Sequence, residues 1–366
     1  MQDIPPLLTN NPSQRLANIQ ALRGLAAFGV LLSHLYIIEQ KYSQDHILSE
    51  LLNFGMVGVD MFFVISGFIM VYVTHKWQSA SGAKIPEFLF ARAGRIYPLY
   101  WVISAALLAV YMIKPQWVFA ASAGNDPNIV KSFLLWPDKA AYPMLEVAWT
   151  LIHEMSFYLI FALILLVSHR YRASLIGLWA VIVVIGAHLG WGQVNAVSSI
   201  LFHPLSLEFC AGVALGYALL KTKNLTQGLP LLIAAIILFI SSVALHVMND
   251  QTVPAMGWLR VLTFGVAASV LLLAAYAVEQ KGRTAPRWSV VLGDWSYALY
   301  LTHVLTLSVM GRIWALVDQP SLWDNFIVLP LLIIGSIIGA GLTHKIIEAP
   351  MMRASKYLQK KLFKRG

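Results

Sequence analysis

The chain contains 366 residues, of which 58% are hydrophobic and 12% are charged, and its mean hydropathy is +0.70. This balance excludes a soluble domain, because one core of this size could not bury so much apolar surface, and it indicates an integral membrane protein. The net charge of +9 does not indicate a nucleic-acid partner, since the basic residues lie between the apolar runs. The single cysteine, Cys210, excludes an internal disulfide and a thiolate metal site.

Ten apolar runs of membrane-spanning length follow one another along the chain. They cover residues 18–39, 54–75, 96–114, 145–167, 173–191, 198–220, 229–248, 258–279, 289–310 and 325–347. The run 198–220 is the least regular, because His203-Pro204 could break its helix near the start. The sequence therefore predicts an all-α, polytopic membrane protein with about ten transmembrane helices. One membrane domain is expected over residues 1–366, with a helical core at 17–349 and a basic tail at 350–366.

The distribution of lysine and arginine predicts the orientation. If both termini are cytoplasmic, twenty of the 26 basic residues fall on the inner side of the membrane. Cytoplasmic loops of membrane proteins carry an excess of lysine and arginine, so we expect both termini in the cytoplasm. We expect the membrane to be the inner membrane of the cell. The basic tail suits contact with anionic membrane lipid.

Several ionisable residues fall inside the apolar runs, where they are costly and usually serve a pathway or a reaction. Arg23 and His34 stand eleven residues apart in the first run, on one helix face and about 16 Å apart along its axis. Counting the helical rise places His34, Asp60 and Glu154 in one layer in the outer half of the bilayer. A polar centre inside the membrane is therefore predicted.

Two further residues, Glu208 and His303, come out at comparable depth. Any one buried histidine is more often a group that bridges helices, but five ionisable residues in one layer favour a catalytic site. Histidine with a carboxylate partner is the commonest general base. We therefore assign His34 as the catalytic base, assisted by Glu154 or Asp60.

Arg23, Arg92 and Arg95 lie at cytoplasmic depth. Arginine forms paired, charge-assisted bonds with phosphate oxygens, so these residues could hold a phosphorylated donor. A helix predicted to start at Tyr97-Pro98 would add its positive end as an anion site. Alternatively, Arg92 and Arg95 only follow the positive-inside rule. Coenzyme A fits the first interpretation, because its diphosphate would stay at the arginines while its pantetheine arm reaches the layer of His34.

Several motifs in order make the chain resemble the acyltransferase family 3 membrane enzymes, most closely the branch linked to exopolysaccharide production and acetylation of surface glycans. The resemblance is carried by Leu22-Arg23-Gly24-Leu25-Ala26-Ala27 with His34, Gly58 to Phe68, Arg92 with Arg95-Ile96-Tyr97-Pro98, Trp149 to Tyr158, Ser296-Tyr297 with Tyr300 and His303, and Ile347-Glu348-Ala349-Pro350.

This resemblance implies a multi-pass enzyme that moves an acyl group, expected to be acetyl, from cytosolic acetyl-CoA to a hydroxyl of a surface polysaccharide or lipid-linked sugar. It implies His34 as base, the three arginines on the CoA phosphates, and no metal. Glu154, Trp149 and Tyr158 would line the acceptor side. Ser66 and His303 complete the predicted substrate site, with Ser66, Tyr158 or Trp149 as candidate oxyanion donors.

Three alternatives stay open from the sequence, and the first is that the enzyme moves a succinyl group rather than acetyl. The acyl group could pass directly to the acceptor, or first to histidine as a covalent intermediate. A transporter or flippase for a glycan intermediate would also place charges within the membrane. We favour the enzyme, because no inverted repeat is visible and the inner arginines call for a phosphorylated partner.

Overall fold

The computed structural model describes residues 16–77, 82–118, 126–222, 225, 227–252, 256–316 and 322–363. Arg15, Lys223, Lys364 and Arg365, which the orientation argument counts on the inner side, lie outside this part. Within it the secondary structure is helical, as predicted. The chain divides into two compact units. The first comprises residues 1–76, 208–299 and 303–337, and the second comprises residues 77–207, 300–302 and 338–366.

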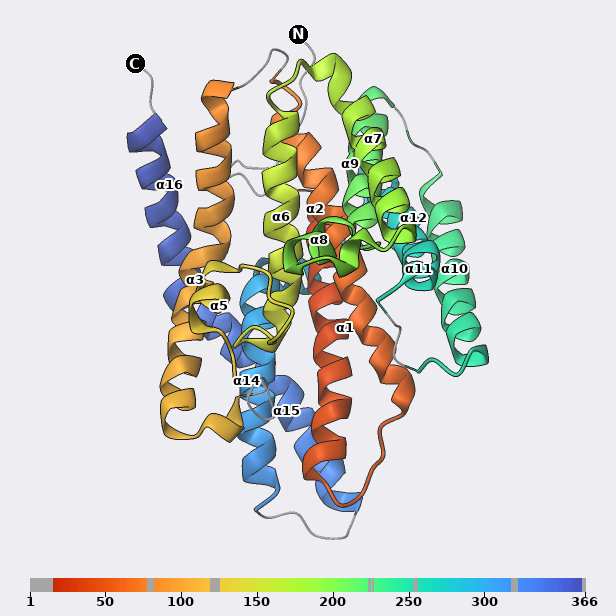
Figure 1. The fold of residues 1–366 in the computed structure, drawn as a ribbon. Coiled ribbons are helices and arrows are strands. Elements are labelled where there is room, and N and C mark those ends of the chain that lie inside the picture. The colour runs from red at the N-terminus through yellow and green to blue at the C-terminus, as the bar shows by residue number, and fades with distance from the viewer. Residues whose placement is uncertain are drawn as a thin grey trace. The chain divides into compact units, whose positions relative to one another are not determined.

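The first unit is built around one long helix. Its elements are α1 (Ala17–Tyr42), the 3₁₀ helix η2 (Glu50–Val57), α2 (Gly58–Thr74), most of α9 (Ser206–Lys221), α10 (Gly228–Met248), α11 (Trp258–Arg260), the π-helix η7 (Val261–Gly265), α12 (Val266–Gln280), α13 (Arg287–Asp294), most of α14 (Ser296–Trp314) and the first part of α15 (Leu322–Thr343). Helix α1 packs against η2, α2, α12 and α13 (Figure 1).

Both ends of α1 are fixed by buried or half-buried carboxylates. At its start, Glu279 accepts a 2.6 Å hydrogen bond from the backbone N–H of Ala17, one of the donors that a helix start leaves without a partner. In its last turn, Glu39 accepts bonds from the backbone of Ile47 and from the side-chain amide of Asn325. These contacts set the position of the helix that carries Arg23 and His34.

A glycine lets α2 approach α1 closely. A Cβ added at Gly58 would lie 2.2 Å from the carbonyl oxygen of Ala26, which no real side chain tolerates. The first turn of α2, which carries Asp60, is therefore held against the middle of α1.

The second unit gathers the remaining helices. It contains η3 (Gly82–Lys84), α3 (Ile85–Ile113), η4 (Pro115–Trp117), α5 (Ile129–Leu134), η5 (Glu146–Ala148), α6 (Trp149–Ile164), α7 (His169–His188), η6 (Trp191–Gln193), α8 (Ala196–Leu201), the end of α15, the π-helix η8 (His344–Glu348) and α16 (Ala349–Phe363). Helices α3 and α16 lie side by side (Figure 1), with the rings of Phe90 and Phe363 5.8 Å apart.

Eight helical stretches of the described residues are long and apolar enough to cross a membrane, which confirms a polytopic α-helical membrane protein. The other two predicted spans are less regular. Run 198–220 is divided at His203-Pro204 into α8 and α9, as the proline indicated, and run 289–310 corresponds to α13 and α14. The tail forms α16, which continues from α15 through η8 as far as residue 363.

The predicted start of a helix at Tyr97-Pro98 is wrong. Helix α3 begins at Ile85 and continues through Pro98, so Arg92 and Arg95 lie in the body of a helix. Proline costs a helix one hydrogen bond, but membrane helices tolerate it where neighbouring groups satisfy the freed carbonyl. The predicted anion site at a helix start is therefore not present at these arginines.

Candidate active site

Two buried histidines meet within the first unit. His34 on α1 is 8% exposed, and His303 on α14 is fully buried. Their ring centroids lie 4.8 Å apart at an interplanar angle of 77°, and Nε2 of His303 lies 3.3 Å from Nδ1 of His34. The structure thus joins the predicted base to a histidine that is 269 residues away in sequence.

Each ring is oriented by its own helix. Nδ1 of His34 lies 2.9 Å from the carbonyl oxygen of Val30, and Nδ1 of His303 lies 2.9 Å from that of Leu299. A carbonyl only accepts, so the network assigns the proton of each neutral ring to Nδ1. The Nε2 lone pair of His303 then faces the Nδ1–H of His34. The basic nitrogen of His34 is accordingly its Nε2, the atom that could remove a proton from a substrate.

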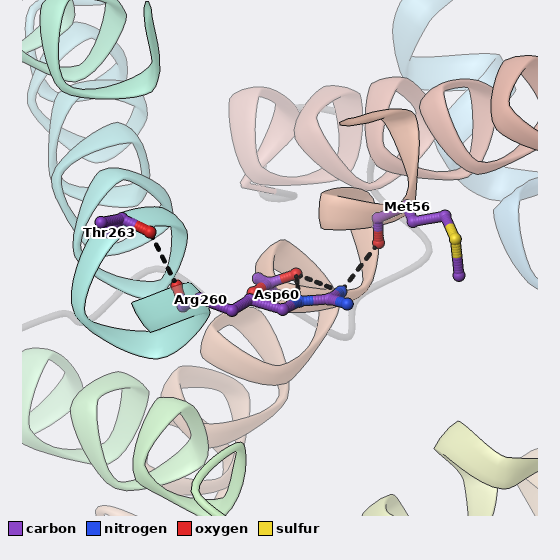
Figure 2. A network of polar contacts seen from close by, with 4 residues as sticks. All are labelled: Met56, Asp60, Arg260 and Thr263. Atoms are coloured by element: carbon purple, nitrogen blue, oxygen red, sulfur yellow. Dashed lines mark hydrogen bonds and ion pairs between the residues drawn. The ribbon is translucent and has the colours of Figure 1, made fainter. Parts of the chain in front are cut away.

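Asp60 is held by an arginine on a distant segment (Figure 2). Nε of Arg260 lies 3.1 Å from both carboxylate oxygens, Nη2 lies 2.7 Å from Oδ2, and both side chains are fully buried. Nη2 also donates to the carbonyl of Met56, and Thr263 in η7 donates to the carbonyl of Arg260. Among the described residues Asp60 is thus engaged by Arg260 and not by His34.

Glu208, predicted in the same layer, is also buried in the first unit. Its carboxylate lies against Gly265 at the end of η7, where a Cβ would come 3.0 Å from Oε1. The carboxylate also lies close enough to Asp60 and Arg260 to interact with both of their charges.

Of the other predicted residues in this unit, Arg23 donates from Nη1 to the side chain of Gln20 at 3.2 Å. Ser66 is buried in α2, on the helix that also carries Asp60.

The second unit contains a separate polar cluster between α3 and α6. The hydroxyl of Tyr158 donates to Glu154, one helical turn earlier. The guanidinium of Arg92 lies over the rings of Phe88 and Tyr158, at 5.8 Å and 6.0 Å. Its Nε is buried without a hydrogen-bond partner among the described residues. Arg92, expected at the donor phosphates, thus lies in one cluster with two residues expected on the acceptor side.

At the start of α6, aromatic rings stack edge to face. Trp149 lies 5.8 Å from His153, and His153 lies 4.9 Å from His203. Beside them, the hydroxyl of Tyr300 lies 2.8 Å from the hydroxyl of Thr150. His153 is buried and contacts both rings.

The predicted site residues fall in both units. Arg23, His34, Asp60, Ser66 and His303 belong to the first, and Arg92, Arg95, Trp149, Glu154 and Tyr158 to the second. Among the described residues no group of three or more His, Cys, Asp or Glu side chains could hold a metal ion.

Sequence reasoning missed the role of Arg260, which it counted as a charge on the outer side. The signal was present, because an arginine three residues into the apolar run 258–279 requires a buried partner, and Asp60 was one of three carboxylates predicted in the outer layer, with Glu154 and Glu208.

Comparison with known proteins gives the class of protein. Residues 16–345 match the family described as "Acyltransferase domain". The chain is 29% identical to the exopolysaccharide production protein ExoZ of Rhizobium meliloti (strain 1021), over 82% of this chain and 91% of that protein. It is 24% identical to the acyltransferase MdmB of Streptomyces mycarofaciens, over 93% of this chain and 92% of that protein. No solved structure matches. The chain therefore belongs to the acyltransferase family 3 and is a polytopic membrane acyltransferase.

Proposed function

We propose that this protein transfers an acetyl group from acetyl-CoA to a hydroxyl of a surface carbohydrate, either a polysaccharide or a lipid-linked sugar. The observation that carries the proposal is the His34–His303 pair, which leaves Nε2 of the buried His34 as a base. The family supports acyl transfer, and the relative named for exopolysaccharide production supports a carbohydrate acceptor.

In the proposed reaction His34 acts as general base. Nε2 takes the proton of the acceptor hydroxyl while the oxygen attacks the thioester carbonyl. The carbon–sulfur bond breaks, CoA leaves as thiolate, and the proton on His34 is passed on to that sulfur. The ester is formed and no net proton is consumed.

His303 is proposed to position His34 and to stabilise its charged form. When His34 is protonated, its Nδ1–H can donate to the lone pair on Nε2 of His303 as well as to Val30. His303 would thus take the place of the carboxylate that orients the histidine base in many enzymes. Glu154 as a further partner of the base remains a prediction.

The donor is proposed to be held by arginine. Arg23, Arg92 and Arg95 carry permanent charges suited to the phosphates of CoA. The unsatisfied Nε of Arg92 supports this, since a bound anion would supply the partner that this buried donor lacks among the described residues.

Deleting the gene from its source cells and restoring it as wild type or His34→Gln tests the function. We expect O-acetyl groups to be missing from the surface carbohydrate of the deletion strain, to return with wild type, and to stay absent with His34→Gln. NMR of the purified carbohydrate measures them, and immunoblots check that both proteins reach the membrane. An unchanged O-acetyl content in the deletion strain would contradict the proposal.

A further inference from the structure

The second unit contains a cavity of about 320 Å³, lined in part by Trp149, which the resemblance places on the acceptor side. It lies beside the start of α6, on the connection between α3 and α6 that the orientation argument predicts on the outer side. Its walls come from α5, the following loop, the first turn of α6 and α8, and they include Lys131, Trp136, Asp138, Tyr142, Trp149 and Ser199.

An unusual backbone turn presents one of its aromatic rings. Helix α5 ends at Leu135, which adopts the left-handed conformation with φ of 52° although it is not glycine. Its side chain is buried, while the backbone N–H of the next residue, Trp136, donates 2.9 Å to the carbonyl of Lys131. Trp136 is left 54% exposed, and Tyr142 on the same loop is 53% exposed. Strained backbone persists where surrounding contacts fix it, and often beside binding sites.

An ion pair supplies the polar groups of the cavity. Nζ of Lys131 lies 2.9 Å from Oδ2 of Asp138, and the backbone of Ala140 donates to the other oxygen. The bond from Lys131 lowers the pKa of Asp138, which therefore stays ionised at neutral pH. Lys139 donates to the carbonyl of Gln193 and so ties the loop to η6.

This lining matches the chemistry of a sugar ring. A pyranose has an apolar C–H face that stacks on exposed aromatic rings, and hydroxyls that need both donors and acceptors at their edge. Trp136 and Tyr142 offer the rings, while Lys131 and Asp138 offer a donor and an acceptor side by side. The lining carries two lysines, Lys131 and Lys139, with one carboxylate, Asp138, and a purely apolar ligand would leave these charged groups without contacts. The volume lies at the small end of ligand sites, about 300–1,000 Å³, and suits one ring rather than a longer chain.

We propose that this cavity binds one pyranose residue of the carbohydrate acceptor. The inference rests on the proposed function and adds to it a recognition site on the loop 135–143. In this role Trp136 and Asp138 determine which acceptors bind and leave the chemical step unchanged.

Kinetics with a defined probe test the site. The probe is a mixture of oligosaccharides from the surface polysaccharide of the deletion strain, and radiolabelled acetyl-CoA is the donor. We expect Trp136→Ala to raise KM for the oligosaccharides about tenfold with kcat nearly unchanged, because a stacked ring is lost. Trp136→Phe should recover part of the affinity, and Asp138→Asn should also raise KM. Trp117→Ala is the matched control, since this tryptophan is 49% exposed on the same connection but does not line the cavity.

Saturation-transfer NMR with the purified protein separates the two proposals. We expect the oligosaccharides to bind wild type and Trp117→Ala but not Trp136→Ala, which would support the sugar site. If this binding pattern is found and no label is transferred, only the proposed function fails. An unchanged NMR signal and an unchanged KM in both Trp136→Ala and Asp138→Asn would overturn the sugar site. Unchanged binding of CoA to each variant shows that the variant is folded.

Discussion

The tautomer of His34 follows from a local helical contact. A histidine whose Nδ1–H bonds to the carbonyl four residues earlier must present Nε2 as its base, and this arrangement occurs at both His34 and His303. The depth of His303 could be predicted by counting residues. Its contact with His34 could not, because helical rise gives the level of a side chain in the membrane but not the direction in which it points.

Replacing His303 tests its positioning role. We expect His303→Phe to lower kcat about tenfold or more while KM for acetyl-CoA changes little, because the protonated base loses an acceptor for its Nδ1–H. His303→Gln should restore part of kcat, since its side-chain oxygen can accept that bond. Steady-state kinetics of label transfer measure both.

His246→Phe is the matched control for this replacement. His246 is also buried in the first unit and also bonds through Nδ1 to the carbonyl four residues earlier, but it packs against Phe54 and Phe264. A loss of kcat in His246→Phe equal to that in His303→Phe would mean that His303 acts only through packing.

Among the secondary-structure elements, the hydrophobic runs predicted where the helices lie, but they predicted less well where a helix is broken. His203-Pro204 divides α8 from α9 as the proline rule predicts, whereas Pro98 leaves α3 intact. Pro98 is tolerated because a membrane helix lacks competing water and keeps its remaining hydrogen bonds. Neither π-helix, η7 or η8, has a signal in the hydrophobic pattern. η7 directly follows Arg260, whose ion pair links α11 to α2.

Variants of the ion pair between Asp60 and Arg260 distinguish a structural role of Asp60 from a catalytic one. We expect Arg260→Gln to destabilise the protein by about 3–5 kcal/mol, because it leaves a buried carboxylate without its partner. The double variant Asp60→Leu with Arg260→Met should recover stability, since apolar residues can replace a buried pair. Thermal unfolding in detergent measures stability, and label transfer measures activity.

The activity of the double variant decides the assignment of Asp60. We expect transfer to recover together with stability, as for a residue that holds α2 against α11. A stable double variant without activity would contradict this and return Asp60 to the catalytic group that its depth in the membrane first indicated.

For the whole molecule, composition predicted a membrane protein and the ordered motifs predicted its family, and both are confirmed. The arrangement of polar groups was only partly predictable. Counting depth placed Arg92 and Glu154 on different sides of the membrane, yet both lie in one cluster with Tyr158. The early start of α3 explains this, because a helix that begins at Ile85 places Arg92 about two turns inside it, whereas the prediction had the helix start after Arg92.

Transfer of radiolabel by the purified protein in lipid vesicles tests the central claim most directly. With labelled acetyl-CoA and the oligosaccharide acceptor, we predict label in the carbohydrate for wild type and for His46→Ala, which replaces an exposed histidine. His34→Ala should lower the rate about a hundredfold or more, the usual contribution of a general base. Equal rates in His34→Ala and wild type, or no label in the carbohydrate with wild type, would contradict the account.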